Sequence, residues 1–318
     1  MAKPADLIHA MLERSGKNLR YATIIPGGIA SYFAGKKRIK YEDGGPDITN
    51  PLVIGGNPNV GPNKYYERAP IARTQELTTT RYEMTRIVGS YVISEQEIDE
   101  NAGVSKILDM AAAKLETLEM EFKNYMRTVM ASTNSGDHPN GIPNLLPSVN
   151  TSGSVGGISL ASVELFRHEV YNFAGAITVN NIEETFDDIL LDMNNGTDKV
   201  TVIFAGRRLF NLHRNAARGK TQINISDSGF GKNMVNLGII GTDHQGIPLV
   251  YDELLDPDVA FFINEEHMLI HILKNANMKR KQLNAPMDQD VIAERFIHEY
   301  QLCSWRQHKT HALVSNKA

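Results

Sequence analysis

The chain has 318 residues, of which 42% are hydrophobic and 22% are charged, and its formal net charge at pH 7 is −4. These values are typical of a globular protein, and a chain of this length can bury a full core, which we expect to be divided between two lobes. The small negative charge argues against a dedicated nucleic-acid binder. The single cysteine, Cys303, excludes an internal disulfide and a cysteine-based metal cluster. The sequence begins with no signal-peptide pattern and has no apolar run near the roughly 18 residues of a membrane span, so we expect a cytoplasmic protein without a membrane partner.

The first part of the chain predicts an extended arm. The first fifteen residues favour a short helix, and an irregular stretch then leads to a basic run at 36–40, which we expect to be solvated surface or, alternatively, to touch DNA or an acidic neighbour. Gly and Pro crowd positions 44–62, and a loop of that length in a compact domain is usually functional. Residues that favour strands follow from 65 to 93, with charges that suit an edge ribbon. We therefore predict a two-stranded arm over residues 46–93.

A long amphipathic helix is predicted directly after the arm. Ser94 and Glu97 match the capping-box pattern of a short helix, which Gly103 then interrupts. From Val104 to Ala131 apolar residues recur every three or four positions, as one buried helix face requires. The predicted face contains Val104, Ile107, Leu108, Ala111, Leu115, Leu118, Phe122, Met126 and Val129. Such a helix would span roughly 40 Å, and a long helix with a projecting arm suits a subunit that neighbouring subunits complete.

The remaining sequence alternates between helical and strand patterns. A loop rich in Ser, Gly, Asn and Pro occupies residues 132–158. Helices are predicted near 160–174, 182–193 and 207–218. Strands are predicted at 200–204, 246–251, 259–263 and 267–273, and a last long strand at 291–302 with a continuation to 314.

Five short segments carry a resemblance that extends over nearly the whole chain. They are VISEQE at 92–97, NGIPN at 140–144, VIFAGRRLF at 202–210, GIPLVYD at 246–252 and ERFIHEY at 294–300. Their order and spacing around the long helix resemble the major capsid proteins of tailed phages with the Hong Kong 97 fold. The resemblance implies an α+β, Hong Kong 97-like capsid fold. Its parts would be an N-terminal arm at 1–45, an extended β-ribbon (the E-loop) at 46–93, a P-domain with the long spine helix at 94–158, an A-domain at 159–264 and return strands of the P-domain at 265–318.

The same resemblance implies a structural major capsid protein and not an enzyme. Copies of the chain would self-assemble into hexamers and pentamers of an icosahedral shell around double-stranded phage DNA, in a virion assembled in the host bacterial cytoplasm. The implied partners are other copies of the chain, packaged DNA held without sequence specificity, and scaffolding, portal and decoration proteins. No scaffolding segment precedes the arm, so we expect a separate scaffold or a processed chain. The alternatives are an encapsulin-type nanocompartment shell and, less favoured, a soluble α/β enzyme.

Charged residues of the arm are the candidate site residues. A ribbon with about fifteen residues per strand would reach roughly 50 Å, enough to lie across a neighbouring subunit. Its charges would then supply intersubunit ion pairs, each weak but repeated at every copy of the contact. The candidates are Arg68, Arg73, Glu76 and Arg81.

No catalytic, cofactor-binding or metal-binding residue is predicted. Gly219-Lys220-Thr221 ends like a phosphate-binding loop, but Arg214 stands where the loop needs a glycine. Residues 192–196 resemble a calcium loop without its closing Glu, so a helix C-cap at Asn195-Gly196 is the better interpretation. His267 and His271 have zinc-ligand spacing for a helix, but a strand would separate them by nearly 13 Å. The other C-terminal histidines, His298, His308 and His311, are expected on a solvated strand face.

Overall fold

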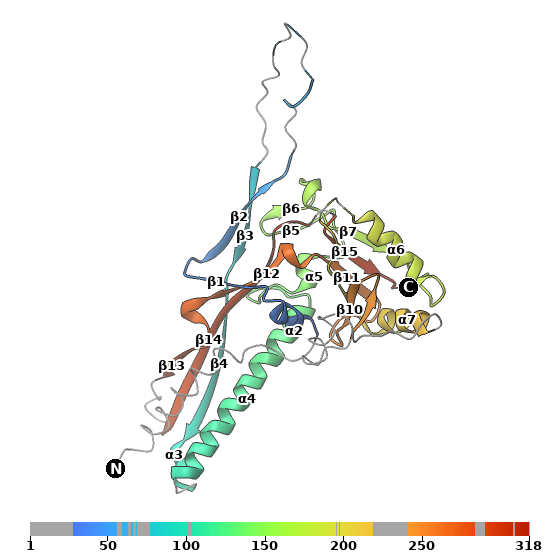
Figure 1. Cartoon of the computed structure of the whole chain (residues 1–318). Coiled ribbons are helices and arrows are strands. Elements are labelled where there is room, and N and C mark those ends of the chain that lie inside the picture. The colour runs from blue at the N-terminus through green and yellow to red at the C-terminus, as the bar shows by residue number, and fades with distance from the viewer. Residues whose placement is uncertain are drawn as a thin grey trace.

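The computed structural model combines a long helix, two larger mixed sheets and a projecting two-stranded ribbon (Figure 1). The described residues are 28–55, 59–62, 65, 68, 77–100, 104–194, 196, 198–218, 241–283, 290–307 and 309–317. Their side chains are described as well, except at 98, 104–113 and 218. The short helix expected in the first fifteen residues and the segment 219–221 lie outside the described residues.

The helix α4 (Val104–Ala131) has the bounds that the apolar spacing predicts. Leu115 and Phe122 on its predicted apolar face are 4% and 3% exposed, whereas Glu116 faces solvent. Leu115 and Phe122 pack against the strand β4 (Thr85–Ser94) and Phe296, whereas Met126 and Met130 join the large core cluster. The face assigned from the sequence is therefore confirmed over the part of the helix whose side chains are described.

A five-stranded sheet lies against α4 and is organised around one long strand, β14 (Val291–Ser304). The strands run in the order β1-β12-β14-β13, and β4 also pairs with β14. The shorter strands are β1 (Ile39–Glu42), β12 (Met268–Leu273) and β13 (Lys279–Leu283). Because β4 pairs antiparallel with β14 from Ser94 back to Thr85, it belongs to this sheet. The expectation that residues 46–93 form one two-stranded arm is therefore wrong for residues 85–93.

The projecting ribbon is formed by β2 (Asp47–Val53) and β3 (Leu77–Glu83), which pair antiparallel along their whole length. Figure 1 shows the ribbon leaving the body of the molecule. The last residue pair of the two strands is apolar and exposed, since Val53 is 66% and Leu77 is 65% exposed. Pro51 lies within β2, inside the segment expected to be a Gly- and Pro-rich loop, and a strand at an edge tolerates proline because no N–H is needed there.

The six-stranded sheet forms the second lobe, in the order β7-β15-β11-β8-β10-β9. Its strands are β7 (Glu169–Asn172), β8 (Val202–Ala205), β9 (Gly241–His244), β10 (Ile247–Tyr251), β11 (Val259–Ile263) and β15 (His311–Ser315). The central strands β8 and β11 are buried throughout, as their continuous apolar sequences predicted. The helices α6 (Ile182–Asp192) and α7 (Arg207–Arg218) share a hydrophobic cluster with these strands.

Short elements complete the described part of the fold. They are the helices α2 (Gly28–Gly35), α3 (Glu95–Glu100) and α5 (Ile142–Leu145), the hairpin of β5 (Ser154–Val155) and β6 (Ile158–Ser159), and the 3₁₀ turns η1 (Glu164–Phe166), η2 (Glu265–His267) and η3 (Lys274–Ala276).

Two further expectations are corrected. The last strand does not continue to 314, because β14 ends at Ser304 and β15 joins the other sheet between β7 and β11. The helix expected near 160–174 is absent from this described segment, which holds η1 and β7 instead. Tyr171 and its neighbours pair in parallel with β15, a partner almost 150 positions away along the chain, and this long-range pairing overrides the local helical pattern.

Candidate functional site

The base of the ribbon is anchored in the core of the molecule. Tyr82 of β3 is 3% exposed and donates a hydrogen bond of 2.6 Å to the backbone oxygen of Ser304 at the end of β14. On the neighbouring residue, the backbone N–H of Arg81 donates to the oxygen of Gly156 in the β5–β6 turn at 2.8 Å. Gly156 has a φ of +56°, and a Cβ there would collide with the Tyr82 ring. The ribbon therefore leaves the body in a fixed direction, although its far end has no core of its own in the described part of the chain.

The predicted site residues of the ribbon are only partly described. Arg68 is exposed, and Arg81 forms an ion pair across the ribbon with Asp47 of β2. Arg73 and Glu76 lie outside the described residues. The Arg81 side chain remains 63% exposed, so its pairing within the chain leaves it accessible to a neighbouring molecule. An intersubunit role of the four residues stays a prediction.

The basic run that follows α2 is engaged in contacts within the chain. Lys36 and Arg38 lie 3.5 and 3.6 Å from a carboxylate oxygen of the buried Glu265, and Lys40 lies 3.0 Å from Glu42. The run lies on the surface, as expected, with Lys37 and Lys40 exposed. It also has acidic partners in the same chain, one of which, Glu265, lies more than 200 positions away.

Local contacts join the strand β4 and the short helix α3 to the long helix α4. The predicted capping box is confirmed, because Glu97 N–H donates to Ser94 Oγ at 3.2 Å and Ser94 N–H donates to Glu97 Oε2 at 3.1 Å. Lys114 of α4 then donates to the same Glu97 carboxylate at 2.6 Å. Gly89 of β4 lets the strand approach α4 closely, since a Cβ there would overlap the Phe122 ring. The short helix, the strand and the long helix are therefore joined by direct contacts.

Two buried carboxylates tie distant segments together, and no local sequence pattern indicates either of them. Asp252 accepts a hydrogen bond of 3.0 Å from the Ile29 backbone N–H, and a Cβ on Gly28 would overlap its carboxylate. Glu294 of β14 is fully buried, accepts from Tyr91 at 2.8 Å and pairs with Arg280 of β13, whose Nε lies 2.6 Å away. Removing one partner of such a buried pair would leave a charge without compensation. Both carboxylates therefore hold the fold together and are not arranged around a reactive centre.

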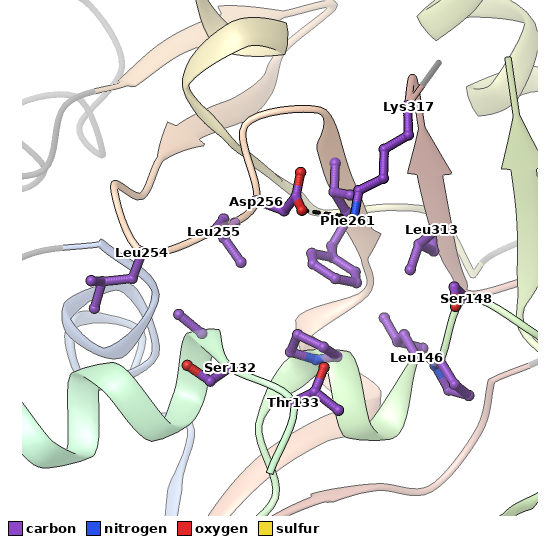
Figure 2. A pocket seen from close by; sticks show the side chains of 14 residues that line it. Ser132, Thr133, Leu146, Ser148, Leu254, Leu255, Asp256, Phe261, Leu313 and Lys317 are labelled. Atoms are coloured by element: carbon purple, nitrogen blue, oxygen red, sulfur yellow. Dashed lines mark ion pairs between the residues drawn. The ribbon is translucent and has the colours of Figure 1, made fainter. Parts of the chain in front are cut away.

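An open cavity of about 510 Å³ lies between the C-terminal end of α4, α5 and the six-stranded sheet (Figure 2). Its wall is mainly apolar, with Leu146, Leu255 and Phe261 among the residues that line it. At its edge, Lys317 Nζ lies 2.7 Å from Asp256, so the charge is already paired. Ser132 and Thr133 add hydroxyl groups, but this cavity brings no nucleophile together with a base.

Several histidines are buried, contrary to the solvated face expected from the sequence. His298 and His311 are fully buried, and burial lowers the pKa of His298 to about 4 and that of His311 to about 3. His308 lies outside the described residues. A third buried histidine, His213 of α7, contacts His244 Nδ1 at 2.9 Å, and burial lowers its pKa to about 4. These imidazoles are therefore neutral near pH 7.

The zinc and calcium interpretations find no support in the described part of the chain. His271 Nδ1 lies 2.8 Å from Glu42, whereas His267, which lies just before the strand β12, is 3.6 Å from Asp198. Across the described residues, no group of three or more His, Cys, Asp or Glu side chains could hold a metal ion. Gly196 has a φ of +68°, as a residue after a helix end often has, but Asn195 is not described. None of the described helices is long and apolar enough to span a membrane.

Comparison with solved structures identifies the fold. The chain is similar to the capsid asymmetric unit of cyanophage A-1(L), with a TM-score of 0.66 and 12% identity over 88% of this chain and 90% of that one. It is also similar to the capsid of the native GTA particle, with a TM-score of 0.55 and 11% identity over 88% of each chain. A third similar structure is the holo-SrpI encapsulin complex from Synechococcus elongatus PCC 7942, with a TM-score of 0.53 and 9% identity over 88% of this chain and 84% of that one.

The fold is therefore the Hong Kong 97-like fold of capsid and encapsulin shell proteins, as the resemblance implied. No protein-family model matches the sequence. No curated protein matches it either.

Proposed function

We propose that the chain is the major capsid protein of a tailed phage. Copies of it would form hexamers and pentamers that close into an icosahedral shell around double-stranded DNA. The observation that carries this proposal is the β2–β3 ribbon, which is anchored at Tyr82, projects from the body and exposes the cross-strand pair Val53 and Leu77. A neighbouring subunit would cover this pair and the outer edges of the two strands, which pair with no further strand among the described residues. The likeness to capsid folds supports the same conclusion.

Each part of the fold would have its own role in such a shell. Residues 1–45 would act as an N-terminal arm and 46–84 would supply the E-loop. Because β4 pairs with β14, residues 85–158 would form the P-domain together with 265–318. Residues 159–264 would form the A-domain, to which the pairing of β15 with β11 adds a strand from the C-terminal segment. Arg68, Arg73, Glu76 and Arg81 would supply ion pairs between neighbouring subunits.

The proposed partners follow from the chemistry of a closed container. The net charge of −4 gives the chain little attraction for nucleic acid, so contact with packaged DNA would be non-specific and confined to local patches. A scaffolding protein, a portal and decoration proteins would act during and after assembly. The assembled protein would be part of the virion, after assembly in the bacterial cytoplasm.

A nanocompartment shell is the second candidate, because the fold also matches an encapsulin. The contents of the particle separate the two functions. A phage capsid would protect double-stranded DNA from added nuclease, whereas an encapsulin-type shell would contain a cargo protein.

The test is to purify particles from cells that produce the chain with its natural neighbours, and then to treat them with nuclease before extracting their contents. Protected double-stranded DNA supports the phage capsid, and a stoichiometric protein cargo without DNA supports the second candidate. A chain that stays monomeric or dimeric at every concentration and salt tested, with no particle in its native source, would refute both.

A further inference from the structure

Two neighbouring helices of the six-stranded lobe have opposite charge. Every charged residue of α6 is acidic, whereas α7 carries arginines and no acidic residue. The two helices contact each other, and Figure 1 shows them together on the side of the lobe that lies away from α4. Each helix therefore presents a surface of one sign at the same end of the molecule.

The acidic surface of α6 is a defined stripe. Glu184, Asp188 and Leu191 lie at positions i, i+4 and i+7, so they share one face of the helix. All three are exposed, and the Leu191 side chain is 72% exposed. Asp187 lies on a different face, 2.9 Å from His244 of β9. Neither Glu184 nor Asp188 forms an ion pair with any described residue.

The basic surface of α7 also follows one face of its helix, with its two arginines at positions i and i+7. Arg207, Asn211 and Arg214 lie at positions i, i+4 and i+7, opposite the face that buries Leu209 and His213. Arg207 and Asn211 are exposed, and Arg214 is partly exposed. Within the described part of the chain, Arg207 and Arg214 have no acidic partner. Their neighbour Arg208 differs in this respect, because it lies 2.8 Å from Asp258.

We propose that the stripe Glu184–Asp188–Leu191 of one copy binds the stripe Arg207–Asn211–Arg214 of the next copy. This inference rests on the proposed shell function and names one contact within its rings. The occupant is a second copy of the chain, because an acidic stripe on α6 and a basic stripe on α7, both without ion-pair partners among the described residues, are present on the chain itself. Contact between two α6 helices or two α7 helices would place like charges together, so a two-fold symmetric pairing of either stripe is disfavoured.

Two neighbouring stripes of opposite sign could also pair reciprocally in a two-fold dimer. A ring instead requires each copy to use α6 toward one neighbour and α7 toward the other, which is a heterologous contact. Heterologous contacts generate rings when the rotation between copies closes. Each exposed ion pair is weak and screened by salt, but every copy in a ring repeats the set. Leu191 would add an apolar contact where both charged stripes lose water. The contact therefore fixes the order of neighbours around a ring more than it supplies bulk affinity.

Charge reversal of the full-length chain tests the pairing. The variants are E184K/D188K, R207E/R214E and the four-fold combination, with E116K/E121K on the exposed face of α4 as the control for net charge. Sedimentation velocity over a range of concentrations measures assembly, and thermal melting checks that each subunit folds. We expect each double reversal on α6 or α7 to raise the concentration needed for assembly by about tenfold or more, and the four-fold variant to return close to the wild-type value.

The outcomes separate the inference from the proposed function. If the wild type assembles and both double reversals assemble equally well, the helices do not form a contact. If both reversals block assembly and the combination fails to restore it, the helices are not each other's partners. A wild-type chain that never associates would overturn the shell function itself, and this contact with it.

Cross-linking gives a second readout that does not depend on shell formation. The only cysteine, Cys303, is buried, so introduced thiols are the only accessible ones. Under oxidation, a D188C/R214C variant should form a ladder of linked chains longer than a dimer. Each single variant should not form such a ladder. A double variant that yields only monomers and dimers would contradict a heterologous contact.

Discussion

Replacing Gly89 with alanine should destabilise the subunit, and it should do so only while Phe122 keeps its ring. A Cβ at position 89 would overlap the Phe122 ring and lie 2.9 Å from Leu118 Cδ1, closer than real carbon contacts allow. Overpacking of this kind costs about 1–3 kcal/mol of the free energy of unfolding. The Gly89 backbone is not in the left-handed region, so alanine meets no backbone strain there.

The magnitude at the other side of the contact follows from burial. Phe122 is 3% exposed within the cluster between α4 and the five-stranded sheet, so F122A should cost about 3–5 kcal/mol. In the F122A background the Phe122 ring is absent, so a Cβ at position 89 no longer overlaps it. The substitution G89A then removes the entropic cost of holding a glycine in a strand. There G89A should become neutral or stabilising by up to about 1 kcal/mol. The sign of the Gly89 substitution therefore reverses with the residue at 122.

Urea unfolding of the unassembled subunit, followed by circular dichroism, measures all four corners of this double-mutant cycle. E116A on the exposed face of α4 is the control and should change the free energy of unfolding by less than about 0.5 kcal/mol. If G89A destabilises the wild type and F122A backgrounds equally, the close approach of β4 and α4 is wrong.

Three further predictions follow from other parts of the structure. S94A should lower the free energy of unfolding by about 1 kcal/mol, because Ser94 Oγ caps α3, and a restored value in S94D would confirm the cap by the same urea assay. Burial holds the pKa of His298 near 4 and that of His311 near 3, whereas a histidine in the unfolded chain has a pKa of about 6.5. As the pH falls from 7 to 5 the unfolded chain therefore binds protons that the folded chain does not bind, and each histidine should lower the free energy of unfolding by about 2 kcal/mol. Urea midpoints that stay constant over this pH range would contradict the burial of the two side chains. Replacing residues 58–79 with a short Gly-Ser linker should leave the melting transition in place but abolish stable shells in sedimentation, whereas loss of the transition would show that the segment belongs to the core.

The parts of the fold that the sequence predicted well are those with strong local periodicity. The α4 helix shows an uninterrupted apolar spacing, and its predicted bounds agree with the structure. The strand β11 is a continuous apolar run, and the capping box at Ser94 is a short motif with its own chemistry. Each of these signals lies within a single stretch of chain, where side-chain spacing alone decides the structure.

The errors arose where distant segments decide the local structure. The strand β1 contains two charged residues among four and forms because it pairs in parallel with β12, more than 200 positions away. In a similar way β7 pairs with β15, and no local pattern indicates either partner. His298 and His311 were misplaced because a polar residue in a strand suggests a solvated face, whereas both faces of these strands are covered.

The candidate site was predictable in kind but not in detail. Gly and Pro composition indicated a projecting arm, and the ribbon β2–β3 projects from the body as expected. The pairing of Arg81 with Asp47 was missed, because antiparallel register cannot be read from two segments joined by a long connection. The opposed charges of α6 and α7 were visible in the sequence, but their importance depends on the two helices lying side by side.

Electron microscopy of particles formed by the purified chain would show whether it builds shells. We expect closed icosahedral shells whose capsomers contain five and six copies, with the β2–β3 ribbon of each copy lying across a neighbour. A uniform population of monomers or dimers under all assembly conditions, or particles in which the ribbon contacts only its own subunit, would contradict this expectation.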